Sequence, residues 1–319
     1  MNIFAPTHTR RPDPALFHRR HDALDRRLGE VVSADPAAYA EASVVLLGCP
    51  QDEGVRRNGG RPGAALAPDA IRRCLYKLTD NGLQNLPIFD LGDTVVGPTL
   101  EATHERHQAV MAQLLRDGKR VVVLGGGNDV AYPDCAALAQ VLGLVLAFNI
   151  DAHLDVRADA VPHSGTPYRQ LLQAGHLQPA AFYELGHQPW SVAAEHLRYL
   201  RELGAQVYSL PAWRAAGLSD LVVGALSYND ADAVFWGFDV DVVRAADAPG
   251  VSAPNALGLA GEEFCALAAL AGAEQRTRLV EFSELNPLFD QDERTARLVA
   301  VAVYHYLVAV AGLYGNEPE

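Results

Sequence analysis

Five side chains of the kinds that bind divalent cations fall in two short motifs of this sequence. Asp151, His153 and Asp155 alternate in DAHLD, and Asp239 and Asp241 alternate in DVD. In an extended backbone, residues i, i+2 and i+4 project to the same side, so each motif would present its side chains together. Both motifs directly follow apolar runs with the composition of buried strands. Either motif alone fits a polar strand end that caps the next helix, but the two together favour a metal site.

The donor types indicate which ion would bind. Four carboxylates gathered in a partly buried site repel one another, and a bound cation relieves that repulsion. Oxygen-rich ligands with some imidazole suit Mn(II), with Fe(II) as the alternative, better than the thiolate-rich sites of structural zinc. Four carboxylates exceed the needs of one divalent ion, so two ions with shared carboxylates are expected. Such a pair can hold a bridging water and lower its pKa, which predicts hydrolysis at a neutral or cationic carbon.

A third polar strand end carries Asn128, which follows the apolar run RVVVL and glycines 125–127. These glycines lack the Lys-Ser/Thr of a P-loop and the spacing of a dinucleotide-binding fingerprint. We therefore expect them to let the backbone pass close to the metal site. The next residue, Asp129, is expected to cap the following helix.

The candidate ligands need a scaffold that places several strand ends side by side. Eight β-rich runs alternate with amphipathic or alanine-rich stretches, several of which stop at glycine. The runs cover residues 43–48, 86–91, 120–125, 144–150, 181–186, 205–210, 233–239 and 278–284. This alternation predicts a single three-layer α/β domain over residues 1–319, with an eight-stranded, mainly parallel sheet and helices on both faces. Residues 1–40 are expected to be an N-terminal extension packed on it, and the site to lie beyond the carboxyl ends of the strands.

Composition excludes several classes of partner. The net charge of −13 over 319 residues argues against nucleic acid or an anionic membrane surface as the main partner. The four cysteines form no CxxC pair, which predicts reduced thiols in a cytoplasm. The apolar run 299–314 is short for a membrane span and contains His305, so a buried helix is expected. The N-terminus has no hydrophobic signal core.

The motifs resemble the ureohydrolase family, which includes arginase, agmatinase and formimidoylglutamase. The resemblance covers most of the chain, with similar segments at 19–32, 52–72, 148–157, 163–172, 238–254 and 282–300. It implies an arginase-like single α/β domain, two Mn(II) ions and a bridging hydroxide that attacks a guanidinium or formimino carbon. Family members often assemble as trimers or hexamers, so a homo-oligomer is one expectation. A cytoplasmic enzyme of histidine metabolism is another, because segments 19–32, 148–157 and 163–172 are closest to formimidoylglutamase.

The resemblance also assigns roles by position. Asp151, Asp155 and Asp239 resemble the shared metal ligands, and His153 and Asp241 resemble ligands of the second ion. Asp155 is further expected to pass a proton during catalysis.

Glu284 matches the carboxylate that meets the cationic nitrogen of the substrate; its alternative role is a helix cap before Asn286. Asn128 stands where the family has the histidine of its first metal ion. Three interpretations follow: Asn128 Oδ1 still binds and both ions remain, the first more weakly; only one ion remains; or the protein no longer catalyses and only binds. We favour the first, because the other ligand positions are intact.

Residues downstream of the metal motifs are expected to face the substrate. Arg157 follows the cluster at the next same-side position and would grip a substrate carboxylate through two hydrogen bonds. Substrate-binding roles are also expected for Ser164, Thr166, Arg169 and His187. His163 is a candidate for proton transfer if its loop turns inward, because Tyr168 falls where arginase has a proton-shuttling histidine.

The sequence therefore predicts a formimidoylglutamase-like hydrolase of linear amidines. N-formimidoyl-L-glutamate would yield glutamate and formamide. Hydrolysis of another guanidino compound, such as arginine or an N-hydroxyguanidine, is one alternative. The other is a catalytically silent homologue that binds an amino acid.

Overall fold

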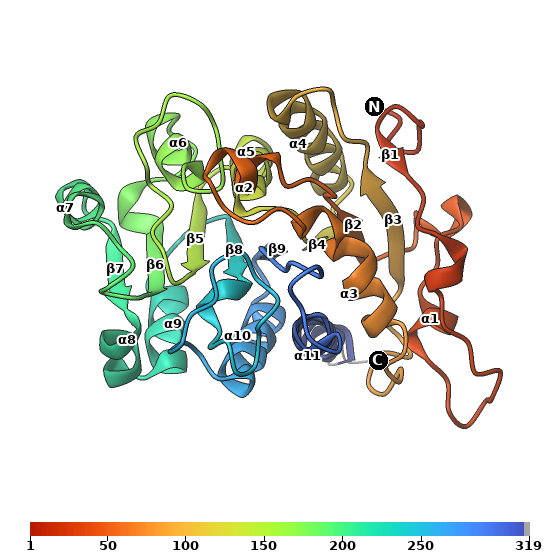
Figure 1. Ribbon diagram of the computed structural model, residues 1–319. Helices are drawn as coiled ribbons and strands as arrows, with labels where there is room; N and C mark the ends of the chain where they lie inside the picture. The colour runs from red at the N-terminus through yellow and green to blue at the C-terminus, as the bar shows by residue number, and fades with distance from the viewer. Residues whose placement is uncertain (316–319) are drawn as a thin grey trace.

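The computed structural model describes residues 1–315 as a nine-stranded sheet between two layers of helices (Figure 1). The strands are β1 (Thr9–Arg10), β2 (Val44–Gly48), β3 (Ile88–Thr94), β4 (Arg120–Leu124), β5 (Val145–Ile150), β6 (Phe182–His187), β7 (Gln206–Ser209), β8 (Ala233–Asp239) and β9 (Thr277–Ser283). Their order is β1-β3-β2-β4-β9-β8-β5-β6-β7. The predicted α/β fold is confirmed. The strand count of eight is corrected to nine, because the two-residue strand β1 pairs antiparallel with β3 at one edge.

Helices cover both faces of the sheet (Figure 1). On one face lie α4 (Leu100–Arg116), α5 (Ala131–Leu142), α6 (Pro167–Gln173) and α7 (Ala194–Leu203). On the other lie α1 (Leu28–Val31), α3 (Ala67–Leu75), α8 (Leu210–Ala216), α9 (Leu218–Ser227), α10 (Gly261–Ala273) and α11 (Arg294–Gly315). Short connections include α2 (Glu53–Arg57) and the 3₁₀ turns η1 (Pro14–Leu16), η2 (Pro36–Ala38), η3 (Ala64–Leu66), η4 (Asn128–Val130), η5 (Pro179–Ala181) and η6 (Val240–Val242).

The strands are apolar on both faces because each face packs under a helix layer. In β4, Val122 and Leu124 join the core beneath α3 and α11, whereas Val121 and Val123 join the core beneath α4 and α5. All four side chains are fully buried. The continuous apolar run is therefore what a central parallel strand requires.

Helix α11 is long and apolar enough to cross a membrane by length and composition alone. It packs against α10 and α3, however, and Val299, Val303 and Leu307 are fully buried in the core. The C-terminal apolar run thus forms a core helix over the residues that the structure describes.

Residues 1–40 lie against the β3 edge of the sheet. Thr9 and Arg10 pair with Thr94 and Asp93, and Leu28 is fully buried. Residues 316–319 of the predicted domain lie outside the described part of the chain.

Candidate metal centre

Four neighbouring strands bring the candidate ligands to one edge of the sheet. The strands β4, β9, β8 and β5 are adjacent and parallel, so their carboxyl ends meet at the same edge. Asn128 and Glu284 follow β4 and β9, Asp239 ends β8, and Asp151 follows β5. Residues far apart in the chain therefore converge at the place where open α/β sheets bind ligands.

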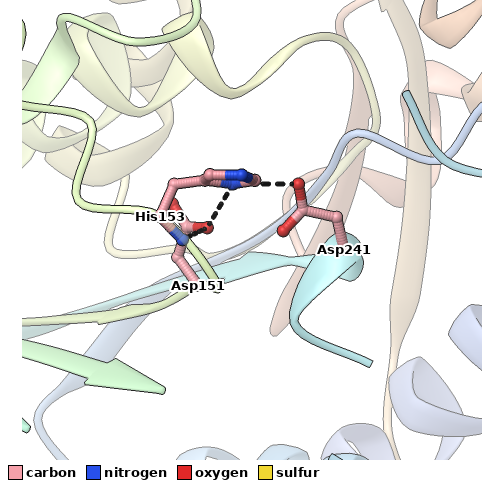
Figure 2. Close-up of side chains that lie close together, drawn as sticks. All are labelled: Asp151, His153 and Asp241. Carbon is pink, nitrogen blue, oxygen red and sulfur yellow. Dashed lines mark hydrogen bonds and ion pairs between the residues drawn. The ribbon is translucent and has the colours of Figure 1, made fainter. Parts of the chain in front are cut away.

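The five carboxylate and imidazole ligands among the six predicted ones form two groups of three that share Asp151. Ligand atoms of Asp151, His153 and Asp241 all lie within 4.8 Å of one another, and so do those of Asp151, Asp155 and Asp239. Figure 2 shows the His153 ring between two carboxylates. Its Nδ1 lies 3.4 Å from Asp151 Oδ1 and 3.1 Å from Asp241 Oδ2. Two groups with one shared carboxylate are the arrangement expected of a binuclear centre.

The backbone reaches this arrangement through turns rather than through an extended strand. Strand β5 ends at Ile150, and Asp151 Oδ1 then accepts a hydrogen bond from the His153 backbone N–H at 2.7 Å. Asp239 Oδ1 likewise accepts from the Asp241 N–H at 2.8 Å. Asp155 has a φ of 43°, in the left-handed region. The extended geometry predicted for DAHLD is thus wrong, although its side chains do converge, and the strained Asp155 costs on the order of 1 kcal/mol.

The electrostatics of the cluster match a cation site. Burial raises the pKa of Asp155 and Asp239 well above the usual range, and it raises that of Asp241. The carboxylate of Asp241 is the largest cause that raises the pKa of His153. Asp241 Oδ1 is buried and has no hydrogen-bond partner among the described residues. Buried carboxylates with a single imidazole and an oxygen atom left unpaired fit a hard divalent cation such as Mn(II).

Asn128 lies at the rim of this cluster and is 1 % exposed. Its Nδ2 donates to Asp155 Oδ2 at 2.6 Å, and Ser283 Oγ donates to its Oδ1 at 3.0 Å. A hydroxyl can donate or accept, so Ser283 can hydrogen-bond the amide of Asn128 in either of its two orientations. Rotation of the amide by 180° would turn Oδ1 toward Asp155 and make it available as a metal ligand.

A cavity of about 380 Å³ opens onto the cluster. Its acidic end is formed by His153, Asp155, Asp239, Asp241 and Glu284. Arg157, Ser164, Asn58 and His196 also line it. The volume falls in the range of small-molecule sites.

Residues 42–309 match the model of the Arginase family. The chain belongs to the arginase family. One relative in this family, formimidoylglutamase of Rhodococcus jostii, is 37 % identical over 279 residues, which is 82 % of this chain and 83 % of the relative. A crystal structure of Trypanosoma cruzi formiminoglutamase with Mn²⁺ has a TM-score of 0.84 and 34 % identity and covers 92 % of this chain and 100 % of that one. A variant of the T. cruzi enzyme with histidine in place of an asparagine, also with Mn²⁺, has a TM-score of 0.85 and 33 % identity, covering 93 % and 100 %.

Glu284 reaches the arginase-family site through an unusual backbone conformation. It follows β9 with a φ of 65° and is 5 % exposed. Its Oε1 accepts from the Asn128 backbone N–H at 2.9 Å. The alternative role as a helix cap has no support, because the next helix, α11, begins at Arg294.

Asp129 does not cap α5, so that prediction is wrong. It lies within the turn η4, one residue before Val130, which is the N-cap of α5. Its Oδ2 instead accepts from Gln51 Nε2 at 2.6 Å and lies 2.7 Å from His104 Nε2. These contacts hold the turn that carries Asn128.

Two predicted substrate residues, Arg157 and Ser164, lie in the cavity wall. Ser164 Oγ accepts from Asn58 Nδ2 at 3.1 Å. Within the described chain the cavity wall does not include His163, Thr166, Arg169 or His187.

These four residues have structural contacts instead. His163 Nε2 lies 2.9 Å from Asp159 Oδ2, and its Nδ1 accepts from the Gly165 N–H. Thr166 Oγ1 donates to the His163 carbonyl at 2.8 Å, which ties the loop.

Arg169 Nε donates to the Val156 carbonyl at 2.7 Å, and its guanidinium lies over the Tyr199 ring. His187 is 3 % exposed, and burial lowers its pKa to about 4. The structure therefore places both side chains in packing positions outside the cavity wall.

Tyr168 falls where arginase has a proton-shuttling histidine. In this structure it is fully buried against Phe182, and its hydroxyl has no hydrogen-bond partner among residues 1–315.

Sequence reasoning missed the cavity residues Asn58 and His196. Asn58 follows α2, and His196 lies on α7, whose residues show only the pattern of an amphipathic surface helix. Neither residue ends a strand, which was the signal that located Asp151 and Asp239. Only the three-dimensional fold places them in one cavity with the metal motifs.

Proposed function

We propose that this protein uses two manganese ions to hydrolyse N-formimidoyl-L-glutamate to glutamate and formamide. The observation that carries the proposal is a single cavity with an acidic cluster at one end and Arg157 in its wall. The amidine group of this substrate is cationic and the rest of the molecule bears carboxylates, so the two ends match. The similarity to proteins named formimidoylglutamase over most of the chain supports the same substrate.

The two groups of ligands would each hold one ion, and Asp151 would contact both. We assign the Asn128 amide oxygen to the ion of the group that contains Asp155 and Asp239, because Asn128 already contacts Asp155. A bound manganese pair supplies hydroxide near neutral pH, because divalent cations lower the pKa of water.

Side chains around the cluster would orient the substrate and move its protons. Glu284 lines the cavity and would accept hydrogen bonds from the amidine on the side of the leaving nitrogen. Asp155 would carry a proton to the leaving nitrogen as the C–N bond breaks. We leave His163 out of this mechanism, because both its ring nitrogens already contact Asp159 and Gly165.

Arg157 would bind a substrate carboxylate. Its guanidinium lines the cavity and forms no ion pair within the described residues, whereas many other arginines there do. Ser164 lies in the same wall and would add a hydrogen bond.

The Arg157→Gln variant is expected to raise KM about tenfold and to change kcat little, because a charge-assisted hydrogen bond contributes roughly 1.5–3 kcal/mol and Arg157 is partly hydrated. Steady-state kinetics measure both constants. Arg198→Gln is the control, since Arg198 is an exposed arginine outside the cavity wall. An equal effect of the two substitutions would remove Arg157 from substrate binding.

A substrate panel tests the proposed function. The protein, loaded with manganese, is incubated with N-formimidoyl-L-glutamate, arginine, agmatine and N-hydroxyarginine, and released glutamate, formamide and urea are measured. Turnover of the first compound above the others supports the proposal. Preferential turnover of a guanidine would show that the substrate is that guanidine and not N-formimidoyl-L-glutamate. No turnover of any of the four compounds at full metal loading would favour a binding protein.

The same proposal extends to the metabolic pathway and the cellular compartment of the enzyme. This substrate would place the protein in histidine metabolism. A reducing cytoplasm agrees with four cysteines that are all free and buried. Assembly into a homo-oligomer stays a prediction, which the molar mass in solution would test.

A further inference from the structure

We propose that His196 is a specificity-determining residue that binds the second carboxylate of a dicarboxylate substrate, while Arg157 binds the first. This inference rests on the proposed function and extends it, because it explains how a glutamate derivative is preferred over an arginine derivative. Arginine and agmatine carry one carboxylate and none, respectively. N-formimidoyl-L-glutamate carries two, and the second needs its own partner.

The position of His196 supports this role. It lies in the first turn of α7, which begins at Ala194, and it is half-buried. The preceding residues Ser191, Val192 and Ala193 line the same cavity, so this whole segment forms one wall of it. Arg157 and four of the assigned metal ligands, His153, Asp155, Asp239 and Asp241, line the cavity too. A substrate with its amidine at the acidic cluster would thus meet both Arg157 and His196.

The His196 ring is available for a ligand. Among residues 1–315, neither it nor the Arg157 guanidinium has a side-chain hydrogen bond or ion pair with another protein group. Other histidines near the site differ: the ring of His163 contacts Asp159, and that of His153 contacts Asp241. Two unpaired donors that line one cavity suit two carboxylates.

The charges around His196 link binding to protonation. Burial lowers its pKa, and the guanidinium groups of Arg157 and Arg169 lower it further, while Glu195 and Asp159 act in the opposite direction. The imidazole of the free protein is therefore neutral at pH 7. A carboxylate bound to it favours the charged form and raises its pKa. Binding of the second carboxylate should then take up a proton, and affinity should fall as pH rises above the pKa of the free protein.

A pair of substrates isolates the contact. N-formimidoyl-L-glutamine replaces the side-chain carboxylate of the glutamate compound by an amide of the same shape. His196→Gln is expected to lower kcat/KM for the glutamate compound by about 10- to 100-fold, mainly through KM, because a charge-assisted hydrogen bond is lost. It should change kcat/KM for the glutamine compound less than about twofold. His176→Gln is the matched control, because His176 is also half-buried and is absent from the cavity wall.

An equal loss with both substrates would show that His196 only supports the structure, and no loss with either would show that it makes no contact; each result overturns the inference.

Calorimetry separates this inference from the proposed function. L-glutamate and L-glutamine lack the amidine, so their binding reports the carboxylate contact even if the protein hydrolyses neither formimidoyl compound. The wild-type protein should bind L-glutamate more tightly and with proton uptake, seen as a binding enthalpy that depends on the buffer near pH 7. His196→Gln should remove both the preference and the proton uptake. Absence of a preference in the wild-type protein would overturn the inference, whereas absence of turnover would overturn only the proposed function.

Discussion

The Asp151→Asn variant is expected to bind manganese at least about 100-fold more weakly and to lose about 1000-fold or more in turnover. Asp151 is the one residue common to both groups of ligands, so its replacement weakens both ions at once. Changes to residues that merely support a ligand already cost 10- to 100-fold in metal affinity. The metal ions stabilise the transition state by several kcal/mol, and the loss of that stabilisation corresponds to the expected fall in turnover. Calorimetric titration with Mn²⁺ and steady-state kinetics measure the two quantities.

The melting temperature of the Asp151→Asn variant, measured with chelator and with manganese, distinguishes loss of a metal ligand from simple misfolding. In chelator, Asp151→Asn should have a melting temperature equal to or above that of the wild-type protein, because one of several mutually repelling carboxylates is gone. With manganese, the wild-type protein should be the more stable, because bound ligand stabilises the folded state. Asp134→Asn is the control: this buried carboxylate on α5 is outside both groups. A variant destabilised equally in both conditions would contradict the assigned role of Asp151.

The Asn128→His variant is expected to bind its first manganese ion roughly 10- to 100-fold more tightly than the wild-type protein. Imidazole is a better ligand than an amide oxygen, and Asn128 already contacts Asp155 at the rim of the cluster. The affinity of the second ion, assigned to His153 and Asp241, should change little. Titration of metal-free protein with Mn²⁺, followed by electron paramagnetic resonance of the free ion, resolves the two constants.

Asn128→Ala is the companion variant for this position. It removes the amide oxygen, so it should weaken binding of the first ion, the one assigned to the group with Asp155 and Asp239. Binding of the second ion should not change. If neither the histidine nor the alanine variant alters the dissociation constant of the first ion, Asn128 is not a ligand. The cluster would then hold its first ion through carboxylates alone.

Much of the fold was predictable because central parallel strands leave a simple pattern. Strand β8, predicted over 233–239, is Ala233–Asp239 in the structure. The other seven predicted strands differ from the observed ones by at most three residues at either end. The short strand β1 was not predicted, because two residues carry no periodic signal. Helices α8 and α9 lie in the stretch 210–227, where Gly217 interrupts a single helical period.

The site was predictable only where a ligand ends a strand. Asp151 and Asp239 were found in this way, and the structure brings them together. The route by which Asp155 joins them was predicted wrongly, since the alternating spacing of the motif carries no sign of the left-handed backbone at Asp155. His196 gave no signal, because a helix residue enters the cavity only through the packing of α7 beside it. Local patterns therefore locate the metal end of the cavity, and tertiary structure locates the substrate end.

Anomalous diffraction at the manganese absorption edge tests the central claim most directly. Crystals of the protein grown with excess Mn²⁺ should show two anomalous peaks, one among Asp151, His153 and Asp241 and the other among Asp151, Asp155 and Asp239. Absence of any peak beside these side chains, or side chains that point away from one another, would contradict a binuclear centre in this protein.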